Sequence, residues 1–268
     1  MGVYGMNPFF SIITVSFNAE AQIEGTIRSS LAQTCGDFEI IVQDGGSRDG
    51  TLNRIPKDKR ISVWSEPDGG IYDAMNKAVR HASGRYCIFM NCGDEFASEN
   101  VLERIYADLQ HAEQPCILYG DYQVNGVHYR QPSNISDLYL YRTPLCHQSM
   151  VFARELFNSV GYFDLKYKIM ADYDLTLRCF RAGVPFLYRD VLVCSYLGGG
   201  ISESKTGIQI KARDRKEIVQ KYYAKGKRLK YDILMALTLR RFRMWFFSGH
   251  APKWVIKVYR MIINVINK

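Results

Sequence analysis

Asp94 is the residue of this chain with the clearest capacity for chemistry. It closes the segment Asn91-Cys92-Gly93-Asp94, which follows an apolar run at residues 86–90 that predicts a buried strand. A carboxylate at the carboxyl edge of an open α/β sheet lies where such sheets bind ligands. Because hard divalent cations prefer oxygen ligands, we expect Asp94 to hold a cation that bridges to phosphate groups. The alternative is a structural role, as a turn residue or a helix cap.

Two more strands are expected to end in polar residues at the same edge. Residues 10–16 and 38–42 are apolar, β-branched runs, and they lead into Phe17-Asn18 and into the turn-rich segment 43–51. Phe17 offers a face on which a base can stack, although a lone aromatic residue more often belongs to a core. The Asp and Ser side chains of the segment 43–51 accept hydrogen bonds from a base or cap the next helix. Three strand ends therefore converge on one polar region.

A third polar segment lies at the start of a predicted helix. Asp68, Asp73 and Asn76 surround the pair Gly69-Gly70, and residues 66–76 hold more polar positions than a helix cap requires. The glycine pair gives this segment the backbone freedom to approach a ligand closely. We therefore expect it to line the same region.

The last candidates lie further along the chain. His147-Gln148 precedes a predicted strand, and Asp172 and Asp174 open a predicted helix. Positions i and i+2 of a helix do not face each other. Only one of the two carboxylates is thus expected to act as a base, while the other caps or packs.

The elements that position these residues predict an α/β fold. Helical periodicity at residues 21–33 and 71–81 alternates with the three strands, which is the pattern of a doubly wound sheet. Further helices are expected at residues 101–112 and 172–182, and further strands at residues 117–119, 149–152 and 184–197. Short alternating pieces between residues 120 and 142 predict hairpins, where an acceptor-binding surface has room.

Composition restricts the class of protein. With 268 residues, 47% of them hydrophobic, the chain can bury one large core. Seven cysteines without CxxC pairs indicate neither a zinc site nor a disulfide framework, and they fit a reducing compartment. No signal peptide and no apolar stretch of about 18 residues is found, so a cytoplasmic location is expected.

The net charge of +8 is unevenly distributed. Residues 205–268 hold 17 Lys and Arg against only three acidic residues, whereas the rest of the chain is acidic. Residues 252–268 predict a basic amphipathic helix, and residues 234–247 have similar character, which is typical of attachment to an anionic membrane. The alternative is a helical hairpin packed on the catalytic domain. Nucleic acid is not an expected partner, because no known binding module accompanies the charge.

Taken together and in this order, five segments resemble family-2 glycosyltransferases of the GT-A fold. They are residues 11–18 (SIITVSFN), 43–51 (QDGGSRDGT), 68–77 (DGGIYDAMNK), 84–94 (GRYCIFMNCGD) and 170–175 (MADYDL). The resemblance spans about residues 9 to 203 and is strongest to bacterial enzymes of O-antigen, capsule and colanic acid assembly. It implies a Rossmann-like mixed sheet in a domain of residues 1–205, with a nucleotide-sugar half (about 9–105) and an acceptor half (about 106–205), followed by a basic helical extension of residues 206–268.

The resemblance also implies roles for the candidate residues. Asp94 corresponds to the motif that holds Mn²⁺ or Mg²⁺ on the diphosphate, and Asp172 to the general base of inverting members. His147, Gln148 and Asp174 are expected to bind the acceptor. The nucleotide sugar is expected to contact a larger set, namely Ser16, Phe17, Asn18, Asp44, Gly45, Asp68, Gly70, Asp73, Asn76 and Asn91.

These expectations combine into one hypothesis and two alternatives. The chain is expected to transfer a single sugar from a nucleotide sugar, with UDP favoured, to a saccharide on a polyprenyl diphosphate at the inner membrane face. The family's usual run of three acids is Asn-Cys-Gly-Asp here, and its Glu-Asp pair is Ala171-Asp172. One alternative is therefore a catalytically inactive nucleotide-sugar-binding assembly partner. The other is a sugar-1-phosphate nucleotidyltransferase, but residues 11–18 lack the glycine and basic residues of its phosphate loop.

Overall fold

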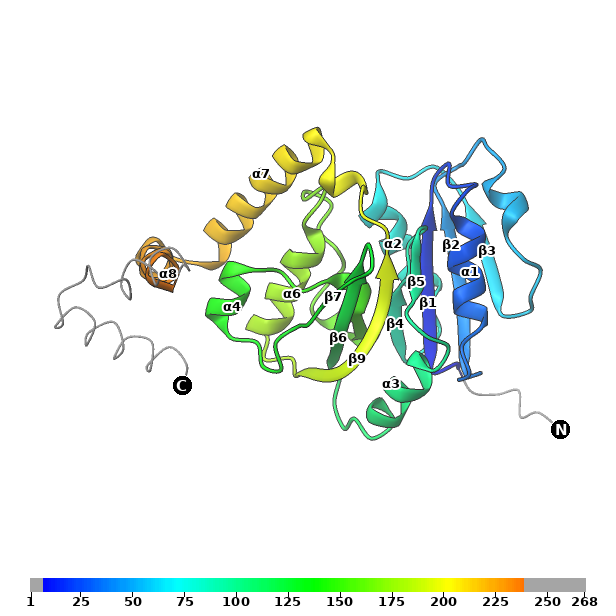
Figure 1. Ribbon diagram of the computed structural model, residues 1–268, viewed down its shortest axis with the longest axis horizontal. Helices are drawn as coiled ribbons and strands as arrows, with labels where there is room; N and C mark the ends of the chain where they lie inside the picture. The colour runs from blue at the N-terminus through cyan, green and yellow to red at the C-terminus, as the bar shows by residue number, and fades with distance from the viewer. Residues whose placement is uncertain (1–6, 239–268) are drawn as a thin grey trace. The chain divides into compact units, whose positions relative to one another are not determined.

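The structure is a computed structural model that describes residues 7–238 (Figure 1). Its first half forms four neighbouring parallel strands in the order β3-β2-β1-β4. Strands β1, β2 and β4 are almost wholly buried, as their unbroken apolar runs require when helices cover a sheet. The elements are β1 (Phe10–Ser16), α1 (Ile23–Leu31), β2 (Phe38–Asp44), the short helix η1 (Thr51–Arg54), β3 (Ile61–Ser65), α2 (Ile71–His81) and β4 (Tyr86–Phe89).

The second half extends the same sheet with mostly antiparallel strands, in the order β4-β8-β6-β9-β5, and β7 pairs with β6. Helix α1 packs on β1 and β5, and α2 packs on β1 and β2. The elements are β5 (Asp94–Phe96), α3 (Val101–Leu109), β6 (Ile117–Val124), β7 (Val127–Tyr129), η2 (His147–Ser149), β8 (Met150–Ala153), α5 (Glu155–Ser159), α6 (Ala171–Arg181), β9 (Phe186–Tyr196) and η3 (Ile201–Glu203).

The predicted elements are confirmed, most of them with small changes at their ends, but β3, β5 and α5 were not predicted. Up to two strands were expected within residues 184–197, and the structure has one, β9, whose register with β6 shifts near Asp121. Strand β5 is too short to show a period, and it exists because Asp94–Phe96 pairs with the end of β9. The expected hairpin is β6–β7, whose turn residues Asn125 and Gly126 have φ of 49° and 78°. An Asn-Gly pair with positive φ at both positions is the favoured two-residue hairpin turn.

The chain divides into two compact units. The first holds residues up to Ser136 and Pro144–Arg215, and it contains all the candidate site residues. Helix α7 (Lys205–Tyr222) contributes residues to both units, while α4 (Asp137–Arg142) and α8 (Lys225–Thr238) belong to the second. The helix predicted at residues 252–268 and most of the segment 234–247 lie outside the described residues. Between residues 7 and 238, no helix combines the length and apolar character needed to span a bilayer.

Candidate functional site

Asp44, the last residue of β2, organises the loop that follows it. Its carboxylate is completely buried and accepts hydrogen bonds from the hydroxyls of Ser16 (3.0 Å), Ser65 (2.7 Å) and Ser47 (2.5 Å). The backbone amides of Gly46 and Ser47 donate to it as well, at 3.0 and 2.8 Å. Burial opposes the charge, but the hydrogen bonds from Ser47, Ser65 and Ser16 outweigh it and lower the pKa of Asp44. A ligand at this strand end would thus meet the loop that Asp44 holds.

Beyond this loop, Phe17, Gly45 and Asp68 lie against one another. The ring of Phe17 is 65% exposed. A Cβ atom on Gly45 would come within 2.5 Å of Oδ2 of Asp68 and 3.3 Å of the Phe17 ring, so any larger residue would have to displace one of these neighbours. The other carboxylate oxygen of Asp68 accepts from the amide of Gly70 at 2.8 Å, where φ is 121°. An exposed ring can stack on a base, and the carboxylate beside it can accept hydrogen bonds from an N–H group of the base or from the ribose hydroxyls.

The neighbouring candidates are engaged within the protein. Asn18 has φ of 48° and accepts from the amide of Arg48 at 2.9 Å, and Asp73 accepts from the amide of Gly69 at 2.9 Å. Asn76 is buried, and its side-chain amide exchanges two hydrogen bonds of 2.9 Å with the backbone of Phe163. A direct contact between Asn76 and a ligand would require these bonds to open.

Asp172 lies at the start of α6 within a network drawn from three distant parts of the chain. One carboxylate oxygen accepts from the hydroxyl of Tyr72 and from the amide of Tyr173, both at 2.9 Å. The other lies 3.1 Å from Nδ1 of His147 in η2. The side chains of Asp172 and His147 are each only 16% exposed. The sheet topology brings these residues together at the edge where β4 ends and β8 begins.

The electrostatics of this network favour the ionised forms of both partners. For Asp172, burial raises the pKa, but the hydrogen bonds and charge of His147 and the hydroxyl of Tyr72 lower it more. For His147, burial lowers the pKa, but Asp172, with smaller contributions from Cys146 and Asp94, raises it to about 9. Near neutral pH the pair is therefore a carboxylate held by an imidazolium.

Asp94 and Asn91 supply the oxygen atoms that a divalent cation would need. Asp94 is 6% exposed and accepts from the amide of Asn91 at 3.1 Å. Burial raises the pKa of Asp94 to about 6, and His147, Asn91 and Gln148 limit the rise. Among the described residues, none donates a hydrogen bond to the buried Oδ1 atom of Asn91.

This donor set fits a hard cation shared with a ligand. A carboxylate and an amide oxygen are ligands that Mg²⁺ and Mn²⁺ accept, with phosphate oxygens completing the shell. Nδ2 of Asn91 lies 3.4 Å from Nε2 of His147, and this orientation leaves Oδ1 for a cation. Turning the amide would let Oδ1 accept from the protonated ring, and Oδ1 would then no longer be available to the cation. Within residues 7–238, no group of three or more His, Cys, Asp or Glu side chains is arranged to hold a metal ion.

Asp174 differs from the prediction that it binds the acceptor. It is completely buried, and its carboxylate pairs with Nε of Arg178 at 2.8 Å, one helical turn later. Arg178 also donates to the backbone carbonyls of Val160 and Tyr162, at 2.9 and 2.6 Å. The correction has a physical reason: Asp174 lies on the packed face of α6, whereas Asp172 lies on the face toward the sheet edge.

Tyr72 is the residue of this network that the sequence analysis missed. It lies inside the polar segment 66–76, and its hydroxyl is 2.9 Å from Asp172 and 2.8 Å from the carbonyl of Ile169. From the sequence, a tyrosine in the first turn of an amphipathic helix is expected to be a core residue. No local pattern links it to Asp172, which lies 100 positions later.

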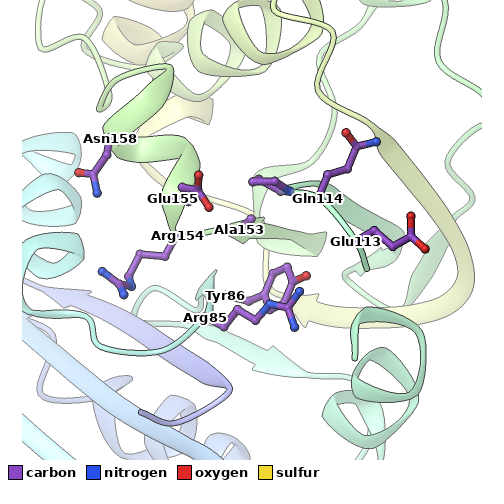
Figure 2. A pocket seen from close by; sticks show the side chains of 9 residues that line it. Arg85, Tyr86, Glu113, Gln114, Ala153, Arg154, Glu155 and Asn158 are labelled. Atoms are coloured by element: carbon purple, nitrogen blue, oxygen red, sulfur yellow. The ribbon is translucent and has the colours of Figure 1, made fainter. Parts of the chain in front are cut away.

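A separate hollow of about 380 Å³ lies at the other end of β4 (Figure 2). Arg85 and Arg154 both line it, and each donates to a main-chain carbonyl, of Ala112 and Gly84 respectively, at 2.7 Å. None of the predicted site residues lines this hollow, whose walls are Arg85, Tyr86, Glu113, Gln114, Pro115, Ala153, Arg154, Glu155 and Asn158. It is therefore distinct from the candidate site.

Comparisons with known proteins agree on one family. The family model described as "Glycosyl transferase family 2" matches residues 11–184. A "PGL/p-HBAD biosynthesis glycosyltransferase" of Mycobacterium bovis is 34% identical over 205 residues, covering 74% of this chain and 80% of that protein.

Solved structures match over most of the chain. S. aureus TarS in complex with UDP-GlcNAc has a TM-score of 0.60 at 19% identity and covers 90% of this chain and 73% of that chain. The mannosyltransferase PcManGT from Pyrobaculum calidifontis, in complex with GDP-Man and Mn²⁺, has a TM-score of 0.59 at 15% identity, covering 97% and 87%. At these identities the likeness concerns the fold.

Proposed function

Because the chain belongs to glycosyltransferase family 2 and has the GT-A fold, we propose that it transfers one sugar from a UDP-sugar to a hydroxyl of a lipid-linked saccharide, with inversion at C1 of the sugar. The observation that carries this proposal is the state of the Asp172 carboxylate. This carboxylate stays ionised at neutral pH and is held in one orientation by Tyr72 and His147. A general base needs both properties.

The roles of the other residues follow from their positions. Phe17 stacks on the base, and Asp68 with the loop at Gly45 accepts hydrogen bonds from the base or ribose. Asp94 and Asn91 would hold a divalent cation, which when bound neutralises the charge of the leaving diphosphate. His147 keeps Asp172 oriented while Asp172 takes the proton of the acceptor hydroxyl that attacks C1. The bond from C1 to the diphosphate breaks on the opposite face of the sugar.

Donor binding tests this function directly. A panel of UDP- and GDP-sugars is compared by thermal shift with and without Mn²⁺, because a ligand that binds only the native state raises the melting temperature. We expect one UDP-sugar to raise it, and more so with Mn²⁺. If no nucleotide sugar raises it under either condition, the transferase proposal fails, and so does the alternative of an inactive partner that binds nucleotide sugars.

The second unit supports attachment to an anionic membrane surface, which suits a polyprenyl-linked acceptor in surface-polysaccharide assembly. On α8, Leu229 and Ile233 are 62% and 51% exposed and lie four residues apart on one face. Lys225, Lys227, Arg228 and Lys230 accompany them. Exposed apolar residues beside basic ones are typical of interfacial helices.

Sedimentation with vesicles tests the attachment. The full chain is compared with the double variant Leu229→Ser/Ile233→Ser, using vesicles with and without phosphatidylserine. We expect the wild type to sediment with the anionic vesicles and the variant to sediment less. Equal sedimentation of both proteins would remove α8 from the proposal.

A further inference from the structure

Three tyrosines form a row across neighbouring strands of the first unit. The rings of Tyr122 on β6 and Tyr129 on β7 have centroids 5.3 Å apart and planes within 8°. Those of Tyr122 and Tyr196 on β9 are 6.3 Å apart and within 10°. Tyr122 is paired with Tyr129, and Tyr196 with Val124, which lies two residues after Tyr122. Paired residues, and residues two apart on a strand, share one face of a sheet, so the tyrosine row lies on a single face.

The inner end of the tyrosine row reaches the candidate active site. Tyr196 is the register partner of Asp94 across β5 and β9, so both side chains emerge on the same face. Tyr196 also interacts with the side chain of Cys146, the residue immediately before His147. The tyrosine row thus begins beside Asp94, proposed to hold the cation on the diphosphate, and close to His147, which holds the proposed general base.

The outer end of the tyrosine row is open. Tyr129 is 46% exposed, and Val127, which shares its face of β7, is 55% exposed. The other face of the hairpin is engaged with protein groups, since His128 lies 2.9 Å from Asp121 and Arg130 lies 2.7 Å from Asp190. Both faces of β7 are exposed, but Val127 and Tyr129 lie on the face that is continuous with the active site, whereas His128 on the other face is paired with Asp121.

We propose that the tyrosine row binds the sugar rings of the acceptor, as a subsite for a disaccharide that extends from the active site toward β7. This inference rests on the proposed function. A pyranose ring presents a face of C–H groups with slight positive charge, which the negative face of an aromatic ring attracts. Tyr122 lies stacked between Tyr129 and Tyr196, so within the row the ring face open to such a contact is the outer face of Tyr129. Tyr122 and Tyr196 contribute ring edges and hydroxyls, which can bond to sugar hydroxyls. Neighbouring strands lie about 4.8 Å apart, so three strands span about 10 Å, which suits two linked sugar rings.

Saccharide binding is measured without turnover. The methyl glycosides of cellobiose, lactose and maltose are titrated against the full chain by saturation-transfer NMR, and UDP is titrated separately with Mn²⁺. Tyr129→Ala removes the exposed ring, Tyr129→Phe keeps the ring, and Arg130→Ala alters the exposed residue that directly follows β7 and pairs with Asp190. We expect at least one disaccharide to bind about fivefold or more weakly to Tyr129→Ala, by analogy with the stacking of bases on aromatic rings. Tyr129→Phe and Arg130→Ala keep most of the affinity.

The outcomes separate the subsite from the function. Equal affinity in Tyr129→Ala and wild type, an equal loss in Arg130→Ala, or no binding of any disaccharide by the wild type overturns the subsite. If UDP binds while one of these results is obtained, the proposed function survives without the subsite. If disaccharides bind through Tyr129 but no nucleotide binds, the subsite stands and the transferase proposal fails.

Discussion

The region around Phe17, Gly45 and Asp68 and the region around Asp94, His147 and Asp172 lie on the same sheet but are held in opposite ways. In the first, an exposed ring and a carboxylate meet over a glycine, and the loop is fixed by its backbone amides and serines. In the second, partly or fully buried charged side chains hold one another. If the proposed function holds, the open region binds the donor and the enclosed region carries out the reaction, so substitutions in the first should change affinity and substitutions in the second should change turnover.

The largest effect is expected at Asp172. Asp172→Asn removes the base but keeps the shape of the side chain, and we expect kcat to fall by about 10² to 10⁴ while UDP still binds. The measurement is steady-state turnover beside a UDP titration. Retained turnover would refute the assignment of the base.

Asp174→Asn is the matched control, since it lies two residues away in the same helix. Breaking its buried pair with Arg178 is expected to cost about 3 kcal/mol of stability, while the turnover of the folded protein stays largely unchanged. If both variants lose turnover alike, the distinction between the two carboxylates is wrong.

The next effect concerns binding in the open region. Phe17→Ala is expected to weaken the binding of UDP by about 1 to 3 kcal/mol, the range for the stacking of one base. The melting temperature of the free protein should stay the same, because the ring is exposed. Leu52→Ala in η1 removes another exposed apolar side chain and serves as control. Calorimetric titration of UDP decides; unchanged affinity in Phe17→Ala would remove the ring from the donor site.

A smaller loss is expected at Gly45. In Gly45→Ala the new methyl group displaces Asp68 or Phe17, the two side chains proposed to contact the base and ribose, so we expect about tenfold weaker UDP binding. The overpacking itself is expected to cost about 1 to 3 kcal/mol of stability. Gly36→Ala is the control, because nothing lies within 4 Å of a Cβ there. Equal UDP affinities in the two variants would contradict the close approach.

The smallest effect is expected at Tyr72. Tyr72→Phe removes a hydrogen bond to an ionised group and is expected to cost about 1.5 kcal/mol of unfolding free energy at pH 7. Because the folded pKa of Asp172 is lowered, its ionisation stabilises the protein above pH 3.8, and this contribution is lost as pH falls through the folded pKa. The difference in unfolding free energy between Tyr72→Phe and the wild type should therefore become smaller as the pH falls below 3.8.

Urea unfolding at pH 7, 5, 4 and 3 measures this difference. Tyr162→Phe is the control, since its hydroxyl lies 3.5 Å from a neutral acceptor, Oδ1 of Asn158. If the difference in unfolding free energy between Tyr72→Phe and the wild type stays constant with pH, the stabilisation comes from the hydrogen bond to the carbonyl of Ile169 and not from the bond to Asp172.

Much of the fold was predictable because its signals are local. The apolar runs of β1, β2 and β4 and the periodicity of α2 were placed within a few residues, and the Asn125-Gly126 turn follows from local backbone preference. Strand β5 escaped prediction because three residues carry no period and its pairing with β9 joins positions about a hundred residues apart.

The sequence by itself determined the fold class, the family and the polar residues at the strand ends, since each depends on residues near one another in the chain. The tertiary structure alone decided which of these side chains meet. It placed Tyr72 and His147 within hydrogen-bond distance of Asp172. It also buried Asp174 on the packed face of α6 and paired Tyr196 with Asp94 across two strands. These are contacts between distant segments, set by sheet order and helix packing, and no local pattern encodes them.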